Sequence, residues 1–190
     1  RPAMATIMSS RHVPGHRTML KTDVLPDSLP TLAETLATAD IHTGAVVTNY
    51  NLDESYGFAD GFDHFQYLPP DRYLGAPADA NRLVIYNVYR LIRERFISQD
   101  REPRFFYQEG DQVNRHGFAF LDQQTDGNFF LWLHYMEPHD PFFSAGGQSY
   151  ARVATPNPPD HMAKIFLDAY RDDVQRFDIW FGQLLRGLES

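Results

Sequence analysis

The order of hydrophobic and polar residues along the chain predicts helices that alternate with buried strands. Residues 43–48 and 129–134 each contain a continuous apolar run, without the regular polar positions of a half-exposed strand. Such runs are typical of parallel strands covered on both faces. Thr31 and Glu34 form a capping-box pattern, which predicts a helix over 31–39. Helices followed by buried strands indicate an α/β protein with a doubly wound, mostly parallel sheet.

Helical spacing of apolar residues predicts further helices. Pro2 suits the first turn of a helix at the start of the chain, and Asp111 is placed to cap another that runs to Leu121. Apolar spacing predicts amphipathic helices over 79–96 and at the end of the chain, where the apolar positions are 166, 170, 174, 177, 181, 184 and 188. On the last helix, Asp173 and Asp178 are expected to be solvated or capping charges. Residues 57–70 and 146–159 are rich in glycine or proline and predict loops.

Composition narrows the classes of partner. The 190 residues are 43% hydrophobic, which is enough for one compact domain, and the net charge of −8 disfavours nucleic acid and acidic membranes. The absence of cysteine excludes disulfides and thiolate metal sites in this chain. Its longest apolar run, 129–133, is far below the roughly 20 residues that span a bilayer. We therefore expect a soluble protein without a signal peptide in this chain, whose true N-terminus lies upstream of Arg1; neither compartment nor oligomeric state is predicted.

The richest candidate chemistry follows the second predicted strand. Ligands of open α/β sheets bind beyond the carboxyl ends of the strands, and here a loop stiffened by Pro138 and Pro141 carries His134 and His139. A structural role for either histidine remains open at this point. A zinc-protease site is disfavoured because the two histidines are five residues apart rather than four. Serine-hydrolase, dinucleotide and nucleoside-triphosphate motifs are absent from the sequence.

Four stretches, taken in order, resemble the sulfatase family of the alkaline-phosphatase superfamily. Residues 136–142, Met-Glu-Pro-His-Asp-Pro-Phe, are similar to the family's Asp-Pro-His-x-Pro-Tyr. Residues 1–8 are similar to the helix that follows the family nucleophile, and residues 170–188 to a long family helix. Residues 48–53, followed by Gly-Phe-Asp-His-Phe at 61–65, take the place of a second signature.

The resemblance implies an alkaline-phosphatase-like three-layer α/β/α fold that is incomplete in this chain. Residues 1–190 are expected to be the central part of one sulfatase-like catalytic domain, without its N- and C-terminal metal-ligand segments. The nucleophile is expected immediately before Arg1, at a helix N-terminus. Ala3 and Met4 stand where the family has Ser and Arg, so either a formylglycine or an unmodified Ser or Thr nucleophile remains open.

The resemblance also implies the roles of individual residues. His139 is expected to protonate the leaving oxygen or contact the transferred group, and His134 is the second catalytic candidate. Arg1, Asn49 and Asn51 are expected to bind substrate, although the two asparagines replace cationic residues of the family and supply no charge. We predict that Asn49 and His139 share one cleft.

These implications combine into one expected function. The parent protein is expected to be a metal-dependent hydrolase of sulfate esters acting on a small anionic substrate, while the 190 residues alone are inactive. A divalent metal, calcium first and manganese, magnesium or zinc otherwise, is expected to be held by ligands outside this chain. Two alternatives remain open: a phosphomonoesterase or phosphodiesterase of the same superfamily, and a non-catalytic binding domain that retains the fold.

Overall fold

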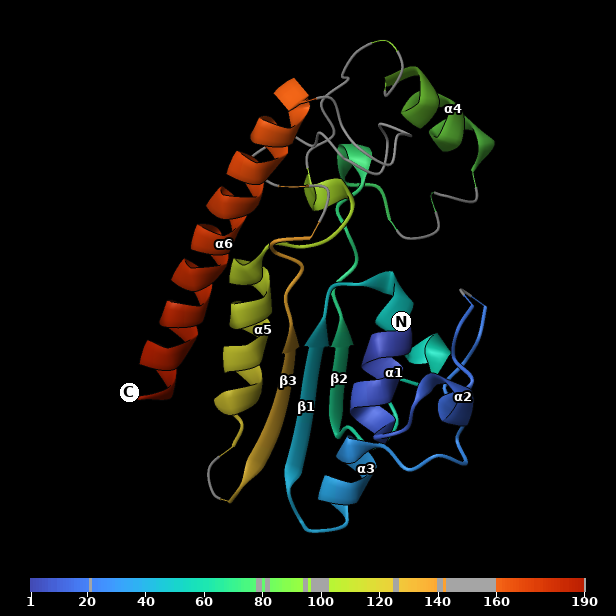
Figure 1. The fold of residues 1–190 in the computed structure, drawn as a ribbon, viewed down its shortest axis with the longest axis vertical. Helices are drawn as coiled ribbons and strands as arrows, with labels where there is room; N and C mark the ends of the chain where they lie inside the picture. Colours follow the sequence, from blue (N-terminus) through green and yellow to red (C-terminus); the bar gives the residue numbers. More distant parts are fainter. Residues whose placement is uncertain are drawn as a thin grey trace. The chain divides into compact units, whose positions relative to one another are not determined.

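The described residues form two compact units (Figure 1). The computed structural model describes residues 1–20, 22–77, 80, 83–93, 96, 103–124, 127–139, 142 and 160–189. The sheet unit consists of Arg1–Pro69 and Asp111–Tyr135, and the helical unit of Pro70–Gly110 and Met136–Ser190. The predicted loop over 146–159 and two residues of the histidine loop, Asp140 and Pro141, lie outside the described residues.

The sheet unit is built around three parallel strands in the order β2-β1-β3. In chain order its elements are α1 (Pro2–Ser9), α2 (Val13–His16), α3 (Leu32–Ala37), β1 (His42–Val47), η1 (Tyr50–Leu52), η2 (Glu54–Tyr56), β2 (His64–Tyr67), α5 (Gly110–Leu121) and β3 (Phe129–His134). Both predicted strands are confirmed within one parallel sheet, and Val47 pairs in register with His134. The capping box at Thr31 and Glu34 is also confirmed.

The loop predicted for 57–70 is wrong. Residues 64–67 form β2, an edge strand paired with β1, and Phe58 is buried in the core with 2% of its surface exposed. Aromatic side chains in this segment pack against the sheet, as shown by the stacked rings of Phe62 and Trp132, whose centroids are 6.0 Å apart. The glycine and aspartate content of the segment therefore marks the turns around β2, not one continuous surface loop.

Helices cover both faces of the sheet. On one face, Met8 of α1 packs in a cluster with Val47, and Trp132 of β3 lies against this cluster. On the other face, Val113 of α5 packs with Val46. Because successive side chains of a strand point to opposite faces, Val46 and Val47 belong to different layers of the core. The predicted α/β/α arrangement is confirmed in this unit.

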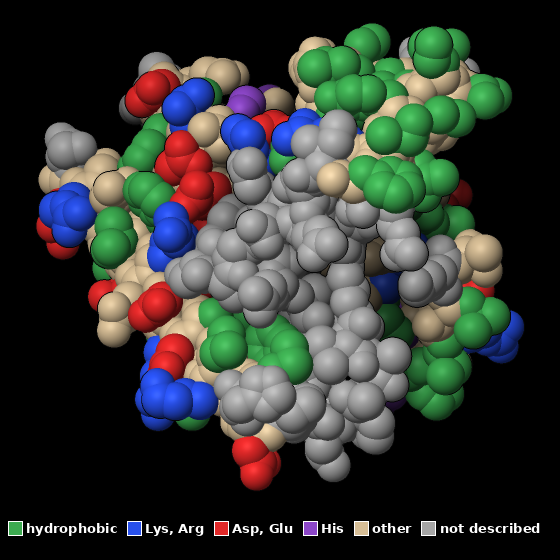
Figure 2. Space-filling view, turned by 90° about the horizontal axis from the view of Figure 1, so that it is seen from above, with side chains coloured by type: hydrophobic (Ala, Val, Ile, Leu, Met, Phe, Trp, Pro, Cys, Tyr) green, Lys and Arg blue, Asp and Glu red, His purple; other side chains and the backbone are tan. Residues whose placement is uncertain are grey.

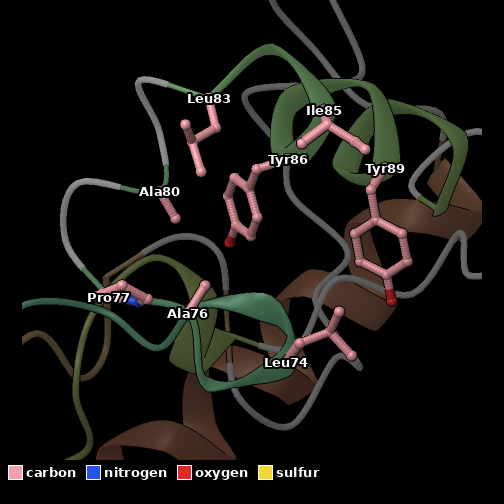
Figure 3. A pocket seen from close by; sticks show the side chains of 8 residues that line it. All are labelled: Leu74, Ala76, Pro77, Ala80, Leu83, Ile85, Tyr86 and Tyr89. Atoms are coloured by element: carbon pink, nitrogen blue, oxygen red, sulfur yellow. The ribbon is translucent and has the colours of Figure 1, made fainter.

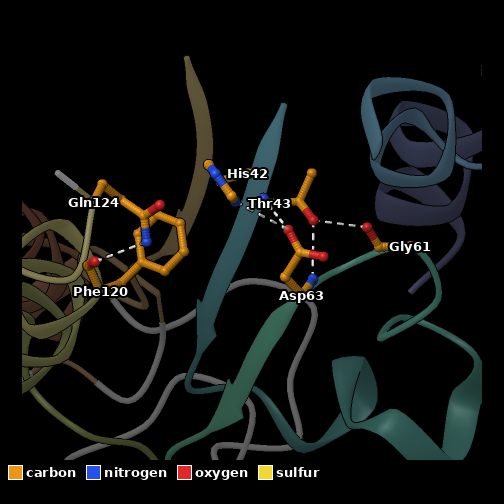
Figure 4. Close-up of polar contacts among 6 residues, drawn as sticks. All are labelled: His42, Thr43, Gly61, Asp63, Phe120 and Gln124. Carbon is orange, nitrogen blue, oxygen red and sulfur yellow. Dashed lines mark hydrogen bonds and ion pairs between the residues drawn. The ribbon is translucent and has the colours of Figure 1, made fainter. Parts of the chain in front are cut away.

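A group of hydrogen bonds fixes the start of β2 at the amino-terminal edge of the sheet (Figure 4). The Thr43 hydroxyl donates to the Gly61 carbonyl at 2.8 Å and accepts the Asp63 backbone N–H at 2.9 Å. The Asp63 carboxylate accepts the backbone N–H of Thr43 at 2.9 Å and lies 3.9 Å from the His42 ring. Asp63 of the family-like stretch therefore sets the start of β2 beside β1, at the edge away from the strand carboxyl ends.

The helical unit contains η3 (Tyr73–Gly75), α4 (Val84–Ile92), η6 (Pro103–Phe105) and α6 (Asp160–Leu188). The helix predicted over 79–96 is confirmed over the bounds of α4. Its apolar residues are exposed, for example 78% of Ile85, and hydrophobic side chains gather over α4 in Figure 2. Some of them face η3 across a cavity of about 540 Å³, which Figure 3 shows. The residues that line this cavity are Leu74, Ala76, Pro77, Ala80, Leu83, Ile85, Tyr86 and Tyr89.

The buried face of α6 differs from the predicted apolar stripe. Phe166 and Ala169 are buried beside Phe142, and Asp173, one turn further along, is fully buried rather than solvated. Val174, a predicted core position, is 39% exposed. The positive charge of Arg176 offsets part of the cost of burying this carboxylate, since its Nε lies 4.0 Å from Asp173 Oδ1. No described helix combines the length and the apolar character needed to cross a membrane.

We expect Gly44→Ala to destabilise the protein, because a Cβ on Gly44 would lie 2.7 Å from the Phe120 ring. Overpacking of this kind costs about 1–3 kcal/mol of unfolding free energy, which urea denaturation can measure. Gly15→Ala is the control, since its Cβ would meet Arg11 at 3.4 Å. Adding Phe120→Leu should recover part of the loss in Gly44→Ala, and a double variant no more stable than expected from the separate losses would contradict the steric explanation.

Candidate active site

The carboxyl edge of the sheet brings several predicted site residues together. Val47 and His134 end neighbouring strands, and the Thr48 hydroxyl donates to the His134 carbonyl at 3.3 Å. Beyond β1 the chain turns into η1, which Asn49 caps: its Oδ1 accepts the Asn51 backbone N–H at 2.9 Å. Asn49, two residues after the end of the strand, thus begins the loop.

The N-terminus of α1 lies at the same edge. Arg1 is the residue that precedes the helix, and its Nε and Nη2 donate to the backbone and side-chain oxygens of Asn51 at 3.1 and 3.0 Å. Asn51 in turn donates from Nδ2 to Asn49 Oδ1 at 3.0 Å. The three predicted substrate-binding residues are therefore joined in one chain of hydrogen bonds, while their roles in binding remain predictions.

Arg1 is held from several sides. Its Nη1 donates to the carbonyls of Leu20 and Asp23, both at 3.1 Å, and the guanidinium lies 3.7 Å above the centre of the Tyr56 ring. The Asp23 carboxylate fixes the turn that supplies these carbonyls, because it accepts the N–H groups of Met19 and Leu20. These backbone hydrogen bonds, with the charge of Arg1, lower the pKa of Asp23. These contacts hold the Arg1 guanidinium in place, so that its other two hydrogen bonds orient Asn51.

The hydrogen bonds also fix which way the two amides point. Asn49 Oδ1 accepts two hydrogen bonds and Asn51 Oδ1 accepts one from Arg1, so each side-chain oxygen is assigned by its donors. The NH₂ groups are then the parts of these side chains that donate. This edge is suited to an oxyanion, because it combines two oriented amides, one guanidinium and the positive end of the α1 dipole.

His134 lies on the same face of the sheet as α1. It pairs with Val47, whose side chain packs in the α1 cluster, and its ring meets that of Trp132 edge-on with centroids 6.1 Å apart. The side chain is half-buried. His134 therefore shares both an edge and a face of the sheet with the residues at the start of α1.

His139 belongs to the helical unit, where a tight turn carries it. Its backbone N–H donates to the Met136 carbonyl at 2.5 Å, and the hydroxyl of buried Tyr107 donates to the His139 carbonyl at 2.6 Å. The backbone is thus anchored while the residue is exposed. Because Asn49 belongs to the sheet unit, the cleft that Asn49 and His139 are predicted to share stays a prediction.

Glu137 anchors the same turn from inside the helical unit. Its Oε1 accepts the Gly110 N–H at 2.8 Å, and only 6% of the residue is exposed. Its buried Oε2 has no hydrogen-bond partner among the described residues. Burial raises the pKa of Glu137, as do the negative charges of Glu109 and Asp173, against the lowering effect of backbone hydrogen bonds. Arg176 offsets part of this negative charge, since it forms an ion pair with Glu109 and approaches Asp173.

Sequence reasoning missed Tyr107 and Glu137 as supports of the histidine turn. Glu137 stands in the family-like stretch, so its position was available as a signal, but its burial was not. Tyr107 is 32 residues from His139 and lies in no recognisable motif. In the part of the chain that the structure describes, no three His, Cys, Asp or Glu side chains are grouped to hold a metal ion.

Comparisons with known proteins identify a family and a fold that the chain shares. The family model described as Sulfatase matches residues 1–190. Two similar solved structures are those of Ps i-CgsB in complex with k-i-k-neocarrahexaose, with a TM-score of 0.60 and 17% identity, and of Ps i-CgsB, with 0.57 and 16%. Each match covers 99% of this chain and 44% of the other, so this chain spans less than half their length. Identities this low show a shared fold alone. No curated protein sequence matches the chain.

We expect Glu137→Gln to change how stability depends on pH. Because the pKa of Glu137 is raised by folding, its contribution to stability is complete below the ordinary value of 4.5 and is lost as the pH rises through the raised pKa. Glutamine removes this titration and keeps an oxygen that accepts from Gly110. The unfolding free energy of the variant, measured in urea across that pH window, should fall less with pH than that of the parent.

The exposed Glu54 supplies the control, as Glu54→Gln removes an exposed carboxylate of the sheet unit. Its pH profile should follow that of the unsubstituted protein. Parallel profiles for Glu137→Gln and the unsubstituted protein would show that Glu137 titrates alike in the folded and unfolded states.

Proposed function

Because this chain belongs to the sulfatase family, we propose that its protein hydrolyses sulfate esters at the carboxyl edge of the sheet unit. The observation that carries the proposal is the hydrogen-bonded chain of Arg1, Asn51 and Asn49 at the N-terminus of α1. These groups supply oriented donors where a transferred anionic group needs them. The general rule that open α/β sheets bind ligands at this edge supports the proposed location.

The modest charge of the edge favours sulfate esters over phosphate monoesters. A sulfate ester carries one negative charge, whereas a phosphate monoester carries between 1.5 and 2 near pH 7. The amides of Asn49 and Asn51 add no charge, and the hydrogen bonds of Arg1 go largely to protein oxygens. A singly charged ester therefore suits these groups better. Phosphodiesters are also singly charged, and they are the second candidate substrates.

In the proposed reaction, a nucleophile carried on the segment that leads into α1 attacks sulfur. The bond between sulfur and the leaving oxygen breaks, and His139 donates the proton that this oxygen takes up. Water then releases sulfate from the nucleophile. Imidazole suits this step because it gives and accepts protons near neutral pH. His134, at the same edge as Asn49, is proposed as a second proton carrier.

We further propose that the whole protein uses a divalent cation, with calcium as the first candidate and manganese, magnesium or zinc as alternatives. When bound, such an ion neutralises charge on the transferred group. Its ligands are proposed to lie outside these 190 residues, as the family resemblance implies. The leaving alcohol is proposed to be a sugar, because the structural neighbour was solved with a neocarrahexaose, a hexasaccharide by name.

The intact protein should hydrolyse 4-nitrophenyl sulfate with a higher kcat/KM than 4-nitrophenyl phosphate, since the leaving group is the same and only the transferred group changes. Release of nitrophenol measures all the reactions. A bis(4-nitrophenyl) phosphate arm tests the second candidate. Faster hydrolysis of either phosphate ester would reassign the substrate, and the lack of turnover on all three, with calcium, manganese, magnesium or zinc supplied, would favour a binding domain.

His139→Ala should lower turnover of the intact protein by roughly 10²- to 10⁴-fold, the range for losing a general acid. The loss should be larger for alkyl sulfates than for 4-nitrophenyl sulfate, because an acidic alcohol needs less proton donation as it leaves. His12→Ala, at an exposed position in α2's N-cap, is the matched control. Equal losses on good and poor leaving groups would assign His139 to anion binding, and no loss would remove it from the site.

A further inference from the structure

The helical unit contains a cationic pocket that the proposed reaction does not use. The arginine pocket has a volume of about 400 Å³ and is lined by three arginines and one carboxylate, together with neighbouring aromatic rings. The charged and aromatic side chains that line it are Asp71, Arg72, Tyr73, Arg93, Arg104 and Phe105. Its size falls in the lower range of small-molecule sites, which run from about 300 to 1,000 Å³.

Two of the three guanidinium groups are oriented by aromatic rings. Arg93 lies over the Tyr73 ring, 4.5 Å from its centre, and Arg104 lies 5.2 Å from the centre of the Phe105 ring. The two rings pack on each other with centroids 4.3 Å apart. A guanidinium stacked on a ring keeps N–H donors along its edge, where they can form paired hydrogen bonds to an oxyanion.

The described residues that line the pocket include more positive than negative side chains. Three arginines face one carboxylate, and that carboxylate, on Asp71, already accepts a hydrogen bond from Gln108 at 3.0 Å. Among the described residues, no carboxylate lies within ion-pair distance of Arg72 or Arg93. This local excess of positive charge occurs in a chain whose net charge is −8. An anionic ligand would complete the pocket.

One short segment connects the pocket to the histidine turn. The Arg104 carbonyl accepts the Asp71 N–H at 2.8 Å, and Arg104 and Phe105 line the pocket. Two residues further, Tyr107 holds the His139 carbonyl at 2.6 Å. A group bound in the arginine pocket is thus held by the same backbone that fixes the histidine turn.

We propose that the arginine pocket binds a sulfate group of a polysulfated carbohydrate. The proposal rests on the proposed function, because it names the class of substrate. In this proposal, the guanidinium groups of Arg72, Arg93 and Arg104 bind a tetrahedral oxyanion. Inorganic sulfate, the product of hydrolysis, has the same chemistry, and the experiment must separate these two sources.

The test measures binding to the intact protein by calorimetry at one fixed ionic strength, with sucrose octasulfate and sodium sulfate as separate probes. Arg72→Gln and Arg93→Gln should each raise the Kd for sucrose octasulfate by roughly 10- to 100-fold, the value of a charge-assisted hydrogen bond. Arg171→Gln is the matched control, since it removes an exposed arginine of the same unit whose ion pair is with Asp168. Its Kd should change less than about two-fold.

Lysine variants distinguish a loss of binding from a loss of folding. Arg72→Lys and Arg93→Lys keep the charge but lose the planar fork, so an intermediate Kd is expected. Equal weakening by Arg171→Gln, or no weakening by the pocket variants, would overturn the proposal. Weakening of sodium sulfate alone would assign the pocket to the product instead. Binding needs no turnover, so a protein that binds sucrose octasulfate through the pocket yet hydrolyses no sulfate ester would refute the proposed function and leave the anion site standing.

Discussion

A parallel sheet must be covered on both faces, and this requirement places the candidate active site. Val46 and Val47 point to opposite sides of β1, and α5 and α1 bury them. Covering the Val47 face brings the start of α1 to the carboxyl edge, where Arg1 meets Asn51. The positive end of a helix and the ends of two strands thus meet because the core has to be closed, and the oriented donors follow from that packing.

Several residues support the candidate site by holding other residues in place. Asp23 holds the turn that holds Arg1, and Arg1 orients Asn51. In the helical unit, Tyr107 and Glu137 hold the backbone of the histidine turn in the same way. Catalytic geometry depends on such supports, because a donor that must reorganise during the reaction loses much of its effect.

Local signals in the sequence predicted the elements that local chemistry determines. The structure contains the capping box at Thr31, the two buried strands and the long last helix. The resemblance to the sulfatase family is also confirmed. The strand at 64–67 was missed because it is short and follows a glycine-rich segment. The burial of Asp173 was missed because helical spacing gives a period but not which neighbours a face meets.

The site was predictable to the same extent. Motif resemblance placed Arg1, Asn49 and Asn51 together, and the structure shows the contacts. It could not reveal that the guanidinium of Arg1 bonds mainly to protein oxygens, nor that Tyr107 reaches the His139 carbonyl from 32 residues away. Those facts depend on tertiary contacts between segments with no sequence pattern in common.

The order of segments also affects how the chain folds and how its length can vary. β3 pairs with β1 although their partners lie 87 residues apart, and residues 70–110 of the helical unit are inserted between them. During synthesis, the sheet cannot gain its third strand until that insertion has emerged. The entropy of closing such a loop grows only with the logarithm of its length, so lengthening the insertion costs the sheet little. Since Arg72, Arg93 and Arg104 all lie in this insertion, that segment of the chain can diverge in length and sequence while the strand pairing stays the same.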